Sequence, residues 1–421
     1  MTTDASTASA QVGPEDDTAV GAATLPLERR CPYDPPAEYR RLREDQPVSR
    51  LTWPDGQVGW LLTRYSDVRA VLSDPRFSSR RGILANPVSP VPPEALELLR
   101  TAPAQLLALD PPEHTGYRRL LTGHFTVRRM RALEAHITEI VAQHLDVLLT
   151  MTPPVDLVTA FTLPIPSLVI CELLGVPYAD RREFQRRSAS LLCLKSGVHD
   201  VLQARNALRE YMLHLVRAKR QHPADDILSD LTRRPEDEGG LNDEEVVSLG
   251  NLLLVAGHET TANMLALGTL TLLEHPAQLD ALRTDPALLD RAVEELLRYL
   301  TIVQFGLVRV ATEDVEIDGH LVRAGEPVVA SLPAANRDPA QFADPETLDV
   351  SRPYSPHLAF GHGVHQCLGQ QLARIEMRAA FGGLLRRFTT LQLAVPLEQV
   401  PFRDDSIIYG IRELPVTWDA A

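Results

Sequence analysis

Apolar and polar positions alternate with two different periods along this chain, and the period predicts which segments form strands and which form helices. Residues 48–53 and 58–63 alternate with a period of two around Pro54-Asp55-Gly56, which is typical of a β-hairpin. A helical period prevails between residues 114 and 220. The other predicted elements are a short helix at residues 66–71 capped by Ser66, a helix containing residues 292–300, strands at residues 306–310, 315–318 and 328–332, one helix after residue 367, and strands near Leu391 and Val416.

The longest predicted helix begins after Asn242 and ends at Glu274, just before a His-Pro pair. Asn242 has a side chain suited to cap the first turn. Because residues 252–256 are apolar on every side, the middle of this helix is expected to be buried. A polar run follows, in which we expect Thr260 to bond back to a carbonyl and Gly257 to loosen the turn, opening a small polar groove. A simple helix kink is the alternative.

These elements predict a mainly α protein with a small β region, an α+β fold. No repeat or linker divides the pattern, so residues 25–421 are expected to form one domain. It follows a disordered tail at residues 1–24, which is rich in Thr, Ala, Asp and Gly. Residues 80–110 form a long, proline-rich loop around a short helical pattern at residues 95–100. Loops of this length inside a compact domain usually carry function.

Composition narrows the classes of partner. The 421 residues carry a net charge of -14, which disfavours nucleic acid. No run approaches the roughly 20 apolar residues of a membrane span, and the N-terminus lacks the basic and apolar regions of a secretory signal. Four scattered cysteines fit neither a disulfide framework nor a zinc ribbon. We therefore expect a cytoplasmic monomer that binds neither nucleic acid nor a membrane.

The residues with the strongest chemical character stand at 360–369, which read Phe-Gly-His-Gly-Val-His-Gln-Cys-Leu-Gly. The helical pattern behind Cys367 places this thiol at the start of a helix, where backbone amides should lower its pKa and favour the thiolate. A thiolate binds metals or attacks carbon. The residues alone leave open a metal ligand, a nucleophile, a structural thiol, or a zinc site shared with His362 and His365.

Glu295 and Arg298 lie three residues apart, on one face of a predicted helix. Such a spacing most often marks an exposed ion pair of little energetic weight. Arg352 could instead complete a buried cluster, because one guanidinium can serve a carboxylate and backbone carbonyls together.

Several motifs together resemble the cytochrome P450 superfamily in order and spacing, over residues 30–420. The similarity is greatest to soluble bacterial members, particularly actinobacterial ones that modify natural products or oxidise foreign compounds. The resemblance implies a triangular helical domain that holds haem between the long central helix and the cysteine loop. The matching motifs are Phe360-x-x-Gly363-x-His365-x-Cys367-x-Gly369, Glu295-x-x-Arg298, Ala256-Gly257-x-Glu259-Thr260-Thr261, Pro111-Pro112-Glu113-His114 with Arg118, residues 309–314, and Ala335-Asn336-Arg337-Asp338.

The resemblance also implies which residues bind haem b. Cys367 would be the axial thiolate of the iron, where it donates electron density and favours O–O cleavage. Glu295, Arg298 and Arg352 match a structural triad that does not touch substrate. Haem contacts are implied for His114, Arg118, Arg309 and His365, at the propionates, and for Phe360, Gly361, Gly369, Ala256 and Gly257.

The activity implied by the resemblance is that of a haem-thiolate monooxygenase, which inserts one atom of O2 into an apolar C–H bond or an alkene with two electrons. Thr260 and Glu259 match the alcohol and the acid associated with proton delivery during oxygen activation. Since no flavin domain follows, electrons would come from NAD(P)H through a ferredoxin and its reductase. Other haem-thiolate reactions, such as oxidative coupling or dehydration, and a non-catalytic haem sensor are the alternatives.

The same resemblance suggests a partner surface and a pocket. Residues 114–131 hold five arginines and no acid, and Arg119, Arg128, Arg129 and Arg131 are expected to form a basic dock for the ferredoxin, with solvated charge as the alternative. The substrate is expected to be bulky and apolar, such as a macrolide, a polyketide or a sterol-like molecule. The predicted pocket residues are Leu192, Val255, Ala256, Ile302, Val303, Phe305, Ile407 and Ile408.

Overall fold

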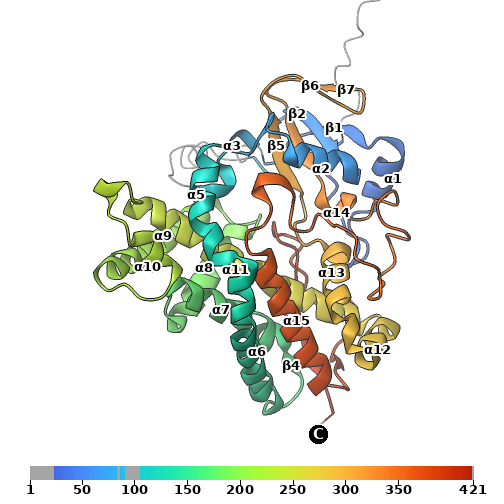
Figure 1. The fold of residues 1–421 in the computed structure, drawn as a ribbon. Helices are drawn as coiled ribbons and strands as arrows, with labels where there is room; N and C mark the ends of the chain where they lie inside the picture. The colour runs from blue at the N-terminus through green and yellow to red at the C-terminus, as the bar shows by residue number, and fades with distance from the viewer. Residues whose placement is uncertain (1–22, 83–85, 91–104, 420–421) are drawn as a thin grey trace, which may run out of the picture.

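The computed structural model of the chain describes residues 23–82, 86–90 and 105–419, most of them in helices (Figure 1). The α+β prediction is confirmed. The predicted tail, as far as residue 22, and the helical pattern at residues 95–100 lie outside the described residues. The helices are α1 (Glu38–Asp45), α2 (Tyr65–Ser73), α3 (Ser79–Gly82), α5 (Glu113–Thr122), α6 (Val127–Leu149), α7 (Pro164–Leu174), α8 (Arg181–Leu192), α9 (Val198–Gln221), α10 (Ile227–Thr232), α11 (Asp243–Leu273), α12 (Pro276–Thr284), α13 (Leu289–Leu300), α14 (Leu332–Ala335) and α15 (Gln370–Arg387).

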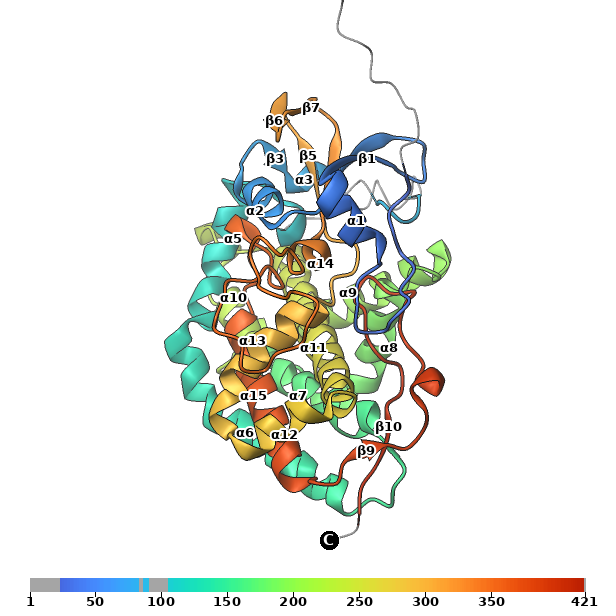
Figure 2. The ribbon, with the colours of Figure 1, turned by 90° about the vertical axis from the view of Figure 1, so that its right-hand side faces the viewer.

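A five-stranded sheet lies at one end of the molecule, at the top of Figures 1 and 2. Its order is β1-β2-β8-β5-β3, and β1 with β2 forms the predicted hairpin, in which Val48 lies opposite Leu62. A three-stranded sheet has the order β4-β10-β9, and β6 and β7 form a separate hairpin. The strands are β1 (Val48–Thr52), β2 (Val58–Leu62), β3 (Phe77–Ser78), β4 (Val155–Asp156), β5 (Leu307–Ala311), β6 (Val315–Ile317), β7 (His320–Val322), β8 (Pro327–Ala330), β9 (Gln392–Leu393) and β10 (Pro415–Thr417).

α11 is the predicted central helix, and its start and its end are confirmed. Asn242 forms a capping box with Glu245: the N–H of Glu245 donates to the Asn242 side chain at 2.9 Å, and the N–H of Asn242 donates to the Glu245 carboxylate at 2.8 Å. The helix packs against α7, α9 and α15. Most of its residues are buried, including Leu253 and Leu254, but Leu252 and Val255 are half-buried and Ala256 is exposed. The expectation that residues 252–256 are all buried is therefore wrong in part, because a cavity lies beside this turn of the helix.

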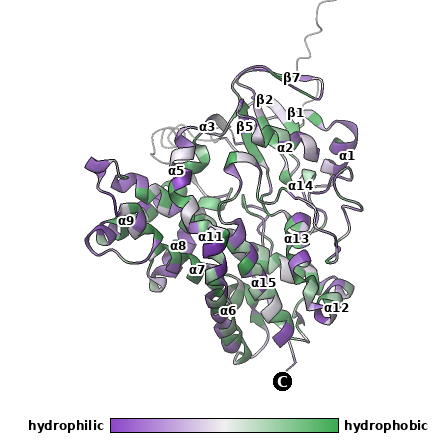
Figure 3. Cartoon of the chain, in the orientation of Figure 1, coloured by the Kyte–Doolittle hydropathy of each residue, from purple (hydrophilic) through white to green (hydrophobic). Residues whose placement is uncertain are grey.

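The main apolar core draws residues from Tyr33 to Trp418, as the proposal of one domain over residues 25–421 requires. Figure 3 shows apolar residues concentrated where the helices meet. Two smaller clusters lie around the five-stranded sheet. Over the part of the chain that the structure describes, no helix combines the length and the apolar character that crossing a bilayer needs.

Two predicted boundaries are wrong, each for a local reason. Ser66 does not cap α2, because the helix already begins at Tyr65, whose N–H donates to the carboxylate of Asp338 at 2.8 Å. The strand predicted at residues 328–332 ends at Ala330, because Ser331 caps the short helix α14. In both cases the chain uses a polar partner that the hydrophobic period does not reveal.

Candidate active site

A cavity of about 290 Å³ lies between α11 and the cysteine loop, residues 360–369. α11 contributes Ala256 and Thr260 to the wall, and the loop contributes Phe360 and Cys367. The other lining side chains are mostly apolar. The structure therefore brings together the two segments that carry the strongest chemical signal in the sequence.

Cys367 stands three residues before the first residue of α15, as predicted. The loop can turn here because Gly361 and Gly363 have positive φ angles of 69° and 74°. A Cβ on Gly363 would lie 2.3 Å from the carbonyl oxygen of Leu72. The N–H of Cys367 donates to the carbonyl of Phe360 at 2.9 Å, which closes the loop and fixes the thiol at the cavity.

The pKa of this thiol differs from the prediction. Burial raises the pKa of Cys367, even though the residue is exposed where it lines the cavity. The N–H groups of Gly369 and Gln370 and the charges of Arg118 and Arg374 lower the pKa, but by less. The helix amides thus act as expected, yet they do not offset the cost of removing a thiolate from water. A bound metal ion would offset this cost, because it deprotonates a coordinating thiol outright.

Four basic side chains converge beside the cavity from distant parts of the sequence. The ring centroids of His114 and His365 lie 4.1 Å apart. Both ring nitrogens of His114 are buried and have no hydrogen-bond partner among the described residues. The guanidinium of Arg118 donates to the carbonyl of Gln366 at 2.5 Å, and that of Arg309 donates to the carbonyl of Val308 at 2.9 Å.

This basic cluster lacks a matching counter-charge. Burial, followed by the neighbouring positive groups, lowers the pKa of His114 and brings that of His365 to about 3. Burial also lowers the pKa of Arg309 to about 10. Asp110 acts in the opposite direction without restoring any of the three. At neutral pH the two arginines can therefore neutralise an anion, while each neutral histidine can donate one hydrogen bond to it.

These residues fit haem. The sulfur of Cys367 would hold the iron, the unpaired nitrogens of His114 would offer a donor to a propionate, and the apolar walls suit a porphyrin. Within the described ranges, no group of three His, Cys, Asp or Glu side chains could hold a metal ion by itself. The alternative of a zinc site at His362, His365 and Cys367 is thereby excluded.

Thr260 lines the cavity, and its hydroxyl donates to the carbonyl of Ala256 at 2.8 Å, as predicted. α11 remains α-helical throughout this turn, so the helix does not break where the polar groove is predicted. Gly257 has a different role: a Cβ there would lie 2.6 Å from the side chain of Ile170. The glycine allows α7 to approach α11 closely beside the cavity.

Glu259 is buried and does not line the cavity. Its carboxylate accepts a hydrogen bond from Arg403 at 2.8 Å, and the Nε2 atom of His258 lies 3.8 Å from its other oxygen. The sequence analysis missed Arg403, because 144 residues separate it from its partner. The predicted pair of acid and alcohol is therefore adjacent in sequence but divided in space, with Thr260 at the cavity and Glu259 turned toward the C-terminal segment.

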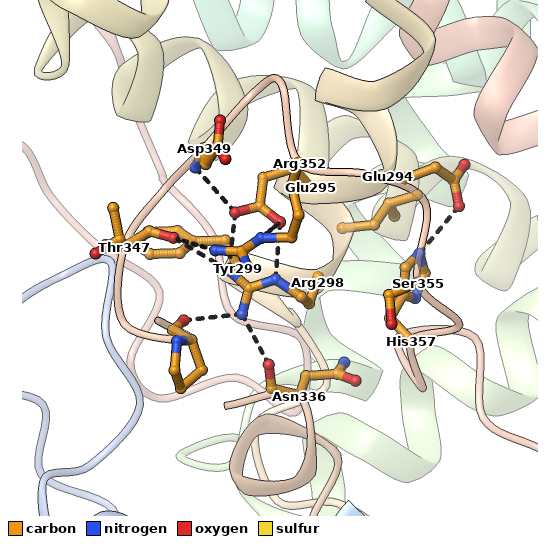
Figure 4. A network of polar contacts seen from close by, with 12 residues as sticks. Glu294, Glu295, Arg298, Tyr299, Asn336, Thr347, Asp349, Arg352, Ser355 and His357 are labelled. Carbon is orange, nitrogen blue, oxygen red and sulfur yellow. Dashed lines mark hydrogen bonds and ion pairs between the residues drawn. The ribbon is translucent and has the colours of Figure 1, made fainter. Parts of the chain in front are cut away.

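Figure 4 shows the cluster formed by Glu295, Arg298 and Arg352, in which Glu295 and Arg298 are buried and Arg352 is half-buried. Arg298 donates to both carboxylate oxygens of Glu295 at 2.8 Å, and Arg352 donates to one of them at 3.0 Å. The exposed fractions of Glu295 and Arg298 are 3% and 2%, which excludes an exposed ion pair and confirms the buried cluster. Arg298 also donates to the carbonyls of Asn336, Pro345 and Thr347.

Of the eight predicted pocket residues, Ala256, Ile302 and Val303 line the cavity. The lining positions of α11 recur every three or four residues, and Val255 falls between them. Phe305 packs in the small cluster beside the sheet. Leu192, Ile407 and Ile408 also lie outside the cavity wall, and the N–H of Ile407 donates to the carbonyl of Leu192 at 3.0 Å.

The sequence analysis also missed lining residues such as Ile170, Leu297 and Met377. They come from three different helices, and nothing distinguishes them from other buried apolar residues until the helices are placed in space.

The family model described as Cytochrome P450 matches residues 187–411. Pentalenic acid synthase of Streptomyces avermitilis is 48% identical over 405 residues, which cover 96% of this chain and 100% of the relative. Vitamin D3 dihydroxylase of Streptomyces griseolus is 44% identical over 398 residues, which cover 94% and 97%. The crystal structure of CYP105P1 in complex with filipin I matches with a TM-score of 0.88 and 43% identity, over 95% of this chain and 100% of that one. The cytochrome P450 MoxA from Nonomuraea recticatena matches with a TM-score of 0.85 and 47% identity, over 94% and 98%. The similarity extends over nearly the whole chain, and the chain belongs to the cytochrome P450 family of haem monooxygenases.

Proposed function

We propose that this cytochrome P450 binds haem b and uses O2 and two electrons to hydroxylate or epoxidise a bulky, apolar small molecule. The observation that carries the proposal is a single cavity that Cys367 and Thr260 both line, among mostly apolar side chains. Haem, when bound there, supplies the iron that activates O2 for insertion of one oxygen atom.

On the cysteine side, Cys367 would hold the iron, and the basic cluster would hold the propionates. A carboxylate beside His114 would supply the acceptor that its buried nitrogens lack. The same negative charge would raise the pKa values of His114 and His365, which burial and positive neighbours have lowered. Phe360, Gly361 and Gly369 line the cavity here and would face the porphyrin.

On the α11 side, we propose that the hydroxyl of Thr260 holds and passes a proton, which is supported by its position in the cavity wall. We propose Glu259 as the acid behind it. Because Arg403 holds the Glu259 carboxylate at 2.8 Å, transfer toward Thr260 requires rotation of the glutamate side chain or a bridging water.

Relatives support the class of substrate. One relative is named for pentalenic acid and another for vitamin D3, and a related structure holds filipin I, all of them organic small molecules. An apolar lining that includes Ile302, Val303 and Leu307 suits a bulky, apolar member of this class, so we propose a natural product or a foreign compound of this kind as substrate.

Thr260→Ala tests the proposal. We expect the variant to consume NAD(P)H and O2 with any accepted substrate, but to release hydrogen peroxide in place of much of the product, since the proton donor at the wall is lost. Thr269→Ala is the matched control: Thr269 also bonds back to a carbonyl of α11, at 2.8 Å, but it does not line the cavity. Wild-type yield of product per NAD(P)H in Thr260→Ala would contradict the assigned role.

For electron delivery we propose NAD(P)H with a ferredoxin reductase and a ferredoxin that docks on the basic segment. Arg119, Arg128 and Arg131 are exposed, and the described residues offer them no ion-pair partner. α5 borders the cysteine loop through Arg118, and α6 packs against α15, so the segment lies on the cysteine side of the cavity. A cytoplasmic location fits the four cysteines, all of which are free thiols.

Charge reversal at Arg128 or at Arg131, one at a time, should slow electron transfer from the ferredoxin at low salt and have less effect at high salt. Arg182→Glu, on α8, is the control for each single reversal, because it makes the same change of net charge outside the segment. Equal rates in the segment variant and the control would contradict a specific dock.

A further inference from the structure

A second ion pair lies beside the cysteine loop, separate from the Glu295 cluster. Arg374 on α15 donates to both carboxylate oxygens of Glu294 on α13, from Nε at 2.6 Å and from Nη2 at 3.0 Å. Its third nitrogen, Nη1, donates to the side-chain oxygen of Gln370 at 3.0 Å. This two-pronged contact fixes both the position and the plane of the guanidinium.

Phe360 lies against this guanidinium. The Cζ atom of Arg374 is 4.6 Å from the centroid of the Phe360 ring, within the range of a cation–π contact. His357 packs on the same ring at 6.0 Å, and its Nε2 atom lies 3.2 Å from Glu294 (Figure 4). Because the carbonyl of Phe360 accepts the N–H of Cys367, the ion pair contacts the sulfur ligand through one intervening residue.

The ion pair stays charged at neutral pH. Burial by itself would raise the pKa of Glu294, but hydrogen bonds from His357 and Arg374 lower it to about 2. Arg374, the positive member of the pair, is the one that contacts the Phe360 ring.

We propose that Arg374, held in place by Glu294, is a positioning residue that tunes the Cys367 ligand through Phe360 and so raises the reduction potential of the haem iron. The inference rests on the proposed binding of haem at Cys367. A fixed positive charge stabilises the negative charge on the sulfur. Reduction of the iron adds negative charge to the same site, so the positive charge favours the reduced state.

Spectroelectrochemical titration of the haem-loaded protein tests this inference. Arg374→Gln removes the charge but keeps a side chain that can hydrogen-bond to Glu294. We expect the ferric–ferrous equilibrium to shift roughly tenfold toward ferric, which is about 59 mV for one electron. Arg374→Lys, which keeps the charge without the fork, should recover part of the shift. An unchanged potential in Arg374→Gln, with the red-shifted Soret band of the carbon monoxide complex intact, would overturn the proposal.

Arg378→Gln is the matched control. Arg378 lies one turn further along α15 and pairs with Asp290 at 3.4 Å, but it has no ring contact with Phe360 among the described residues. Its loss should leave the potential unchanged. A shift as large as that of Arg374→Gln would show a general effect of charge and would overturn the specific role.

Glu294→Gln separates positioning from charge. Loss of a negative charge would by itself raise the potential, but we expect a fall, because Arg374 loses its anchor and leaves the ring. A rise would show that Glu294 does not position Arg374. The Soret band keeps this test apart from the proposed function: its absence in the unmodified protein would refute haem binding at Cys367, whereas unchanged potentials refute the tuning alone.

Discussion

Two charged clusters differ in how their hydrogen bonds are met. The cluster on α13, formed by Glu295, Arg298 and Arg352, finds its partners within the chain, whereas His114 and its basic neighbours face a cavity without a matching anion. Every nitrogen that Arg298 can donate from reaches a carboxylate or a backbone carbonyl. Neither nitrogen of His114 reaches any acceptor among the described residues. The first cluster is complete within the chain and holds the fold together, while the second is completed only by a ligand.

Glu376 on α15 provides a third kind of burial. It is 1% exposed, and neither carboxylate oxygen has a hydrogen-bond partner within the described ranges. Burial raises its pKa to about 8, although the nearby Thr261 hydroxyl lowers it in part. Protonation makes this acid tolerable, since no cation among the described residues pairs with it. Glu376 is therefore neither paired within the chain, as Glu295 is, nor directed at a ligand, as we propose for His114.

The largest effect should come from breaking the complete cluster. Glu295→Ala leaves the buried guanidinium of Arg298 and the half-buried one of Arg352 without their carboxylate, and we expect a loss of about 3–5 kcal/mol in the free energy of unfolding. Glu183→Ala is the control, because Glu183 also pairs with two arginines but on the surface. Urea unfolding should show a large fall in the midpoint for the first variant and almost none for the second. Similar urea midpoints for Glu295→Ala and Glu183→Ala would mean that burial does not make the Glu295 ion pairs more important for stability than the exposed Glu183 pairs.

Glu376→Gln should stabilise the protein, and only at higher pH. Since the folded pKa lies above the ordinary value of 4.5, the stability contributed by the protonated acid is full below pH 4.5 and is lost as pH rises through about 8. Glutamine mimics the protonated form. The stability difference between variant and wild type should therefore grow by about 3 kcal/mol from pH 5 to pH 8. A difference that does not change with pH would refute the raised pKa.

The smallest change should separate ligand binding from folding. His114→Phe keeps a ring of similar size and removes two nitrogens that bind nothing in the protein. We expect haem to transfer to an acceptor globin about tenfold faster, the equivalent of about 1.4 kcal/mol, while the urea midpoint does not fall. His124→Phe, at a buried histidine outside the cavity wall, should leave haem transfer unchanged. A lower midpoint with normal haem retention in His114→Phe would assign the residue to the fold.

Local signals in the sequence predicted the parts of the molecule that depend on neighbours along the chain. Asn242 and the apolar run behind it gave α11, and the spacing of Glu295 and Arg298 gave one face of a helix. The sequence could not decide whether that face was buried, because the carbonyls that receive Arg298 come from residues 336–347.

The sequence motif predicted where the thiol of the site lies, but it did not predict the pKa of that thiol or the ion pairs around it. Cys367 lies where a loop meets a helix, as expected, but the amount of protein around the thiol decides its pKa, and that depends on the whole fold. Arg403 and Arg374 escaped notice for a related reason. Their partners lie 144 and 80 residues away, and an arginine in an arginine-rich chain carries no signal of its own.

The parallel pairing of β2 with β8 has a consequence for the time course of synthesis. β1 and β2 form a hairpin early, but a lone hairpin is marginal in water until a third strand joins it. That strand, β8, is synthesised much later, because the residue that pairs with Leu62 is Ala330. At about 5–20 residues per second, a ribosome needs roughly 15–50 seconds to make the chain between them. The N-terminal strands are thus among the first parts of this enzyme to be made and among the last to be completed.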